Sequence, residues 1–157
     1  MNLSDLKSFL YKTNQAGYAT GKYSNWIKEK DGSTTIHFID KDWEAHDNFF
    51  GGEPFGGRLV VFHKQKPIWM MVYYGFITDY TNVTIEEVYK YLQSCLADPP
   101  LHFPIRGKRH VTNKKYGYTN NWTGDIANFN GTETISFNKK CIYKATYLGG
   151  WINLRSE

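Results

Sequence analysis

Apolar positions recur with a helical period in two short segments of the chain, and elsewhere they mainly follow the two-residue period of strands. The first helical segment is marked by Leu3, Leu6 and Leu10. Asn2 or Ser4 can accept a hydrogen bond from the free backbone amides at its start. The pattern predicts a helix over residues 3–13.

The second helical segment carries start and stop signals as well as the period. Thr84 and Glu87 have the spacing of a capping box, and Pro99 and Pro100 cannot continue a helix. These signals predict a helix over residues 84–97. Its apolar face is formed by Ile85, Val88, Leu92, Cys95 and Leu96.

The remaining segments predict strands, because they are rich in β-branched and aromatic residues and are separated by glycines. Residues 68–74 (IWMMVYY) are apolar in both alternating sets, which predicts a central strand covered on both faces. The predicted strands are Thr34–Ile39, Trp43–Phe50, Arg58–His63 and Ile68–Tyr74, then the region of Trp122, Thr134–Phe137 and Cys141–Leu148.

The two halves of the chain resemble one another at an offset of 73 or 74 residues. We therefore expect an α+β fold of two pseudo-symmetric helix-plus-antiparallel-meander repeats, residues 1–80 and 81–157, packed around a shared aromatic core in a single domain, 1–157. Chance similarity between two aromatic hairpins is the alternative. Matched pairs include Phe49/Trp122, Phe55/Phe129, Gly57/Gly131, Trp69/Tyr143 and Tyr73/Tyr147.

Composition adds one unusual feature to this picture. The 157 residues are 41% hydrophobic and 22% charged, as in ordinary globular domains, but they include 5 Trp, 12 Tyr and 10 Phe. Tyr and Trp need polar partners when buried. This large number of aromatic rings therefore suggests a lined cavity or a contact face, unless the rings simply fill the core. The net charge of +4 favours anionic ligands but is too small for a dedicated nucleic-acid binder.

Cysteine usage and segment hydropathy point to a reducing compartment. Cys95 and Cys141 fit no disulfide scaffold or metal motif and are expected to be buried thiols. The first residues have no apolar core behind a basic start, and no stretch is apolar over the length of a membrane span. We expect a cytoplasmic protein without membrane contact.

Several short motifs together resemble the bacterial and archaeal domain family of unknown function numbered 5680, over roughly residues 5–152. Some members of that family are fused behind a helix-turn-helix segment, which implies a sensing module. This chain departs from the pattern at Val72, where the family usually has Asn, and at Leu148, where it often has His. The motifs are Tyr18-Ala19-Thr20-Gly21, Phe49-Phe50-Gly51-Gly52, Pro67-Ile68-Trp69-Met70, Tyr73-Tyr74-Gly75, Gly124-Asp125, Phe129-x-Gly131-x-Glu133 and Tyr147-x-Gly149-Gly150.

The segment from Gly51 to Arg58 is the strongest candidate binding element. Paired glycines leave backbone amides open to a ligand, and Arg58 can hold a carboxylate or phosphate. No Gly-Lys-Ser/Thr follows, so it is not a nucleoside-triphosphate loop. A turn that needs glycine for its backbone conformation explains the same residues without a ligand.

Two further sets favour a site between the halves. Trp69, Tyr73, Tyr143 and Tyr147 fall on one side of their strands and could wall a cavity with Trp122. Residues 106–115 form a basic loop, which is either a solvated loop or a phosphate contact.

Catalytic and metal-binding patterns are weaker. His46, Asp47 and Glu53 could serve as acids or bases in a small hydrolase, although sequence proximity does not establish contact. His37, His46 and His63 stand on three predicted strands without a recognised ligand spacing, so we expect no metal site and no cofactor.

These observations favour a non-enzymatic domain that binds a small anionic, nucleotide-like molecule, to sense or sequester it. A small hydrolase and a protein-interaction module are the alternatives, and a homodimer stays open. The expected ligand-binding residues are Phe50, Gly51, Gly52, Glu53, Arg58, Trp69, Tyr73, Arg106, Arg109, Asn121, Trp122, Asp125, Tyr143 and Tyr147.

Overall fold

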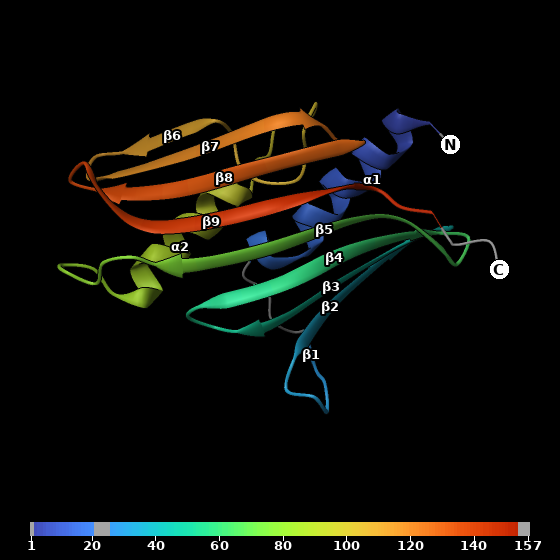
Figure 1. Cartoon of the computed structure of the whole chain (residues 1–157), viewed down its shortest axis with the longest axis horizontal. Helices are drawn as coiled ribbons and strands as arrows, with labels where there is room; N and C mark the ends of the chain where they lie inside the picture. The colour runs from blue at the N-terminus through green and yellow to red at the C-terminus, as the bar shows by residue number, and fades with distance from the viewer. Residues whose placement is uncertain (1, 21–25, 154–157) are drawn as a thin grey trace.

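The computed structural model describes residues 2–20 and 26–153, so Gly21 of the early Tyr-Ala-x-Gly motif lies outside it. Within these described residues, two helices and nine strands follow one another (Figure 1). They are α1 (Leu3–Ala16), a 3-10 turn η1 (Tyr18–Thr20), β1 (Trp26–Lys28), β2 (Thr34–Asp40), β3 (Trp43–Gly51), β4 (Phe55–His63), β5 (Lys66–Ile77), α2 (Ile85–Leu96), β6 (His110–Asn113), β7 (Tyr116–Asp125), β8 (Asn128–Phe137) and β9 (Lys140–Trp151).

Both predicted helices are confirmed, and their ends follow the expected capping chemistry. Asn2 accepts a hydrogen bond from the Ser4 amide at the start of α1. The Thr84 and Glu87 side chains accept from each other's backbone amides at the start of α2, as in a capping box. The helix at residues 3–13 extends further than predicted, to Ala16.

All nine strands form one antiparallel sheet with the order β1-β2-β3-β4-β5-β9-β8-β7-β6. Strands β1 to β5 form one run of neighbours in chain order, and strands β6 to β9 form a second. The two runs join where β5 pairs with β9. In that junction Tyr73 stands opposite Tyr147, and Met71 opposite Gly149. The predicted strands are confirmed within β2, β3, β4, β5, β7, β8 and β9, whereas β1 and β6 were not predicted.

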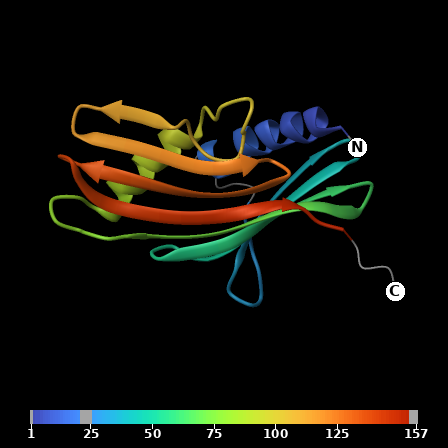
Figure 2. The same cartoon turned by 45° about the horizontal axis from the view of Figure 1, so that its top comes forward.

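The expectation of two helix-plus-meander repeats packed around a shared core is wrong. The two runs of strands lie edge to edge in one sheet instead of facing each other, because β5 and β9 satisfy each other's open backbone groups. Both helices lie on the same face of that sheet (Figure 2). Two separate clusters of buried residues result, one beneath α1 around Trp69 and one beneath α2 around Tyr143.

Neither of the described helices covers the second face of the sheet, which corrects the prediction for residues 68–74. Alternation sends Trp69, Met71 and Tyr73 toward the helices. Val72 and Tyr74 point to the other face, where they are 37% and 54% exposed. The strand is central in the sheet, as predicted, but it is covered on only one side. Neither described helix has the length and apolar character of a membrane span.

Candidate functional site

A cavity of about 460 Å³ lies between the two helices and the first five strands of the sheet. Sites for small molecules commonly have volumes of about 300–1,000 Å³. Most of its wall is apolar and comes from α1, α2, the strands and the segment that follows α2. Leu10, Ile36, Leu59, Met71 and Leu92 are examples of these apolar wall residues.

Asp47 is the acidic group in this wall. It stands on β3, and its Oδ1 accepts a hydrogen bond of 2.5 Å from the Tyr73 hydroxyl on β5. Burial raises the pKa of Asp47 to about 6, although the hydrogen bond from Tyr73 and the charge of Arg106 act in the opposite direction. Burial, followed by the charge of Asp47, also raises the pKa of Tyr73. The cavity therefore contains a carboxyl group that can exchange a proton near neutral pH.

Gly57 allows this contact, because it lies on β4 between the two strands. Gly57 is the cross-strand partner of Tyr73, and the Tyr73 side chain passes over it toward β3. A Cβ atom at Gly57 would lie 2.7 Å from the Tyr73 hydroxyl and 2.5 Å from the Asn48 carbonyl oxygen. Only glycine leaves the tyrosine room to cross the strand.

Arg106 brings a positive charge to the cavity wall, but that charge is already paired. Its guanidinium binds both carboxylate oxygens of Glu133, a residue that is completely buried on β8. The hydroxyls of Tyr118 and Tyr143 donate to the same carboxylate at 2.7 and 3.0 Å. Burial alone would lower the pKa of Arg106, but the charge of Glu133 outweighs it and raises that pKa. The pair is a fixed, neutral element of the wall.

Asn14, on α1, contributes an unsatisfied polar atom to the same cavity. Its Oδ1 is buried and has no hydrogen-bond partner among the residues that the structure describes. Buried carbonyl oxygens are almost always paired, because an unpaired one loses its bond to water without replacement. The cavity wall therefore offers one unused acceptor, in addition to the carboxyl group of Asp47.

Four of the residues expected from the sequence to bind a ligand line this cavity, as does Asp47, which the sequence suggested as an acid or base. Tyr73 and Arg106 belong to its polar wall, as described above. Gly51 and Gly52, at the turn between β3 and β4, lie at its rim, where both are exposed. Gly51 has φ of +81°, which favours glycine whether or not a ligand binds.

The other aromatic rings predicted to surround a cavity instead pack against neighbouring side chains. Trp69 stacks on Phe129 and donates its indole N–H to the Ile126 carbonyl at 2.8 Å. Tyr143 and Tyr147 are buried, with their hydroxyls bound to Glu133 and Asn120. Trp122 stacks on Phe103 at 4.5 Å between ring centroids. None of these four rings is part of the cavity wall.

The polar residues predicted for the site are dispersed. Arg58 and Asn121 are exposed, and the strand register places both on the sheet face that the described helices do not cover. Phe50 lies on the same face and is 51% exposed. Asp125 accepts the Ala127 amide within a turn. Arg109 lies over the Trp122 ring, 3.6 Å from its centroid.

Glu53 is held by neighbouring groups, and the acids and bases suggested for a hydrolase do not meet. The Glu53 carboxylate accepts hydrogen bonds from the Ile77 amide at 2.8 Å and from the hydroxyls of Tyr80 and Tyr89. His46 and Asp47 are consecutive residues of one strand, so their side chains project from opposite faces of the sheet. His46, Asp47 and Glu53 therefore do not form one catalytic group.

The sequence analysis missed Asn14 and Glu133 as site residues. Glu133 had a visible signal, because it occupies the inward set of β8 with Phe129 and Ile135. A glutamate at an inward position of a strand needs a buried cation, and Arg106 provides it. Asn14 has no comparable signal, because its environment depends on how α1 packs.

Residues 47–152 match the family described as "Domain of unknown function (DUF5680)". The chain belongs to this family. The matched region contains Asp47, Tyr73, Arg106 and Glu133, but not Asn14. The family resemblance seen in the sequence is thus confirmed for most of the chain. No curated protein and no solved structure matches.

Proposed function

We propose that this DUF5680 domain binds a small organic molecule in the cavity between its helices and its sheet. One observation carries the proposal: the wall of a largely apolar cavity of about 460 Å³ includes the Asn14 Oδ1 atom and the Asp47 carboxyl group, and the first is an unpaired acceptor within the described residues. A ligand that supplies donors to both would remove a cost that the empty site bears.

The chemistry of the wall favours a neutral or cationic aromatic molecule. Phe38, Phe49, Phe55 and Tyr89 supply ring surfaces, which suit a flat apolar ligand. The positive charge of Arg106 is neutralised by Glu133, whereas Lys28, an exposed residue of the wall, donates to the neutral Thr34 hydroxyl at 2.8 Å and keeps its charge. An anion would meet the Asp47 carboxylate inside the cavity, and the exposed Lys28 would have to compensate for that repulsion. The ligand proposed here therefore differs from the anionic, nucleotide-like molecule that the sequence favoured.

Calorimetric titration with four probes tests the proposal. Tryptamine, indole, indole-3-acetate and AMP share an aromatic ring but differ in charge. We expect tryptamine to bind most tightly, then indole, with the two anions weakest, because Asp47 attracts a cation and repels an anion. Asp47→Asn is expected to reduce the preference for tryptamine over indole.

A matched control is Asp42→Asn, which removes an exposed carboxylate that forms a 3.9 Å ion pair with Lys64. This variant is expected to retain the wild-type order of affinities. If none of the four probes binds, or if the anions bind best, the proposed ligand chemistry is wrong. If Asp42→Asn and Asp47→Asn change affinity equally, the ligand is not in this cavity.

A further inference from the structure

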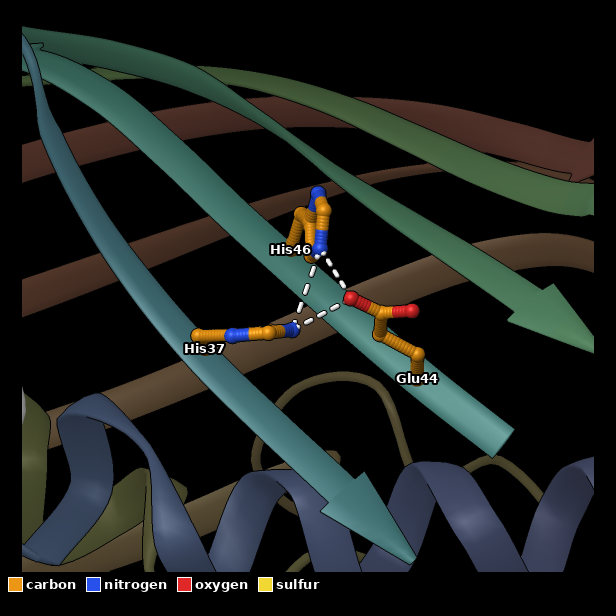
Figure 3. A group of neighbouring side chains, drawn as sticks. All are labelled: His37, Glu44 and His46. Atoms are coloured by element: carbon orange, nitrogen blue, oxygen red, sulfur yellow. Dashed lines mark hydrogen bonds and ion pairs between the residues drawn. The ribbon is translucent and has the colours of Figure 1, made fainter. Parts of the chain in front are cut away.

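Three potential metal ligands converge on the sheet face opposite the cavity (Figure 3). They are His37 on β2, and Glu44 and His46 on β3. The His37 and His46 Nε2 atoms lie 3.1 Å apart, and Glu44 Oε1 lies 2.5 Å from the first and 2.7 Å from the second. This group is separate from the proposed ligand cavity, because the sheet itself stands between them.

Strand register creates the group, although the three residues have no recognised spacing in the sequence. His37 and His46 are direct cross-strand partners, and Glu44 is two residues from His46, on the same side of β3. Ile36 and Phe38 line the cavity, so His37 between them points to the other face. His63, which the sequence grouped with the other two histidines, instead packs against Trp43, one of the side chains against the α1 core.

The distance between the two imidazole nitrogens suits a shared ion, whereas the Glu44 oxygen lies at hydrogen-bond distance from both nitrogens and would move back by about 0.7 Å to bind the same ion. In a tetrahedral zinc site, Zn–N bonds of about 2.0–2.1 Å place two ligand nitrogens about 3.3 Å apart. The observed separation of 3.1 Å is close to this value. Without a cation, both imidazoles compete for one carboxylate oxygen and their Nε2 atoms face each other. A metal ion would accept lone pairs from all three atoms at once.

The surroundings also permit entry of an ion. The three side chains are 32–41% exposed. On β4, the residues directly opposite His46 and Glu44 are Val60 and Phe62, so neither direct partner brings a charge to the group. The Phe62 ring lies 4.9 Å from the His46 ring and shields one side of the group from water.

We propose that His37, Glu44 and His46 bind one divalent transition-metal ion of the Zn²⁺ class. Two imidazoles and one carboxylate are ligands that Zn²⁺ accepts, and three protein ligands leave a fourth position for water or for a group of another molecule. This proposal replaces the expectation of no metal site, which rested on sequence spacing alone.

Metal binding by the full chain tests this assignment. After removal of metals with a chelator, wild-type protein dialysed against Zn²⁺ is expected to retain one ion per chain. Loss of a residue that only supports a metal ligand typically weakens metal binding by about 10–100-fold. His37→Ala and His46→Ala each remove a ligand and should weaken Zn²⁺ binding by more than this. His110→Ala is the matched control, because His110 is exposed on β6 at the other edge of the sheet and should bind Zn²⁺ as wild type does.

A conservative variant and a spectroscopic measurement test the proposal even if an alanine variant is unstable. Glu44→Gln retains the size of the side chain and is expected to weaken Zn²⁺ binding without unfolding the chain. Co²⁺ in place of Zn²⁺ should give the visible absorption of a tetrahedral site in wild type and lose it in Glu44→Gln. The proposal is overturned if wild type retains no stoichiometric ion, if the ligand variants bind like wild type, or if His110→Ala loses as much affinity.

Discussion

The Tyr73 hydroxyl reaches over Gly57 and donates to Asp47 on the second strand away, at 2.5 Å. The same geometry occurs on the other side of the β5–β9 pair. There Tyr147 passes over its partner Gly131 on β8 and donates to Asn120 on β7 at 2.6 Å. In both cases a glycine in the intervening strand lets a tyrosine cross that strand and place its hydroxyl beneath a helix. One of these two bonds ends in the cavity, and the other in the packed core.

Gly57→Ala tests the first of these crossings. The added Cβ would lie 2.7 Å from the Tyr73 hydroxyl and 2.6 Å from Phe49 Cβ, so we expect a loss of about 1–3 kcal/mol in the free energy of unfolding. Urea denaturation measures this loss. Gly52→Ala is the control, because a Cβ there meets no atom within 4 Å and should change stability little. Equal stability of the two variants would show that the tyrosine does not need the gap.

Asp47→Asn tests the buried carboxyl through pH. The pKa of Asp47 is about 6 in the folded chain, against an ordinary value of 3.8. Between about pH 4 and 6 the folded chain therefore binds more protons at this site, and its contribution to stability falls as pH rises. Above that window the ionised carboxylate costs about 2–3 kcal/mol, which asparagine avoids while still accepting the Tyr73 bond.

The expected result is an Asp47→Asn variant that is more stable than wild type at pH 7 and equal to it near pH 4. Urea denaturation of both proteins across this range gives the difference directly. A variant that is less stable than wild type at pH 7, or a difference that does not depend on pH, would contradict the raised pKa.

Glu133→Ala tests the paired charge behind the cavity. The change leaves Arg106 buried without its partner and frees the hydroxyls of Tyr118 and Tyr143, so we expect a loss of about 3–5 kcal/mol in unfolding free energy. Thermal or urea denaturation measures it. Glu86→Ala, at an exposed position of α2, should change stability by about 0.5 kcal/mol or less. A small effect at Glu133 would mean that Arg106 finds water or another partner.

Glu53→Ala tests the view that Glu53 is a structural acceptor. The substitution removes the partner of the Ile77 amide and of the Tyr80 and Tyr89 hydroxyls, and we expect a loss of about 1–3 kcal/mol. Glu29→Ala, which changes an exposed glutamate, is the control for denaturation experiments. If Glu53→Ala were as stable as wild type, Glu53 would not be a structural acceptor and would be available to bind a ligand.

Local features of the fold could be predicted from the sequence. The capping box at Thr84 and the alternation in residues 34–39 involve only neighbours along the chain, and both occur as expected. The arrangement of the halves could not be predicted in this way. Aromatic and glycine matches indicate strands with similar partners, but they do not distinguish two units packed face to face from two units joined edge to edge.

The candidate site was predicted only in part for the same reason. Tyr73 and Arg106 were identified from residue type and position, and both line the cavity. Trp69 and Tyr147 are chemically equivalent candidates, yet they are packed in the core, because the cavity lies under one half of the sheet only. The His37–Glu44–His46 group depends on cross-strand register, which sequence spacing does not reveal.

The central claim is that a small molecule occupies the cavity bounded by Asp47 and Asn14. Backbone amide chemical shifts, recorded by NMR while tryptamine is added, test it most directly. The account predicts that the largest shifts occur at residues of the cavity wall, such as Asp47, Gly52, Tyr73 and Ile105, and that Val111 and Thr112 on β6 remain unchanged. Shifts confined to the uncovered face of the sheet, or no shifts at saturating tryptamine, would contradict it.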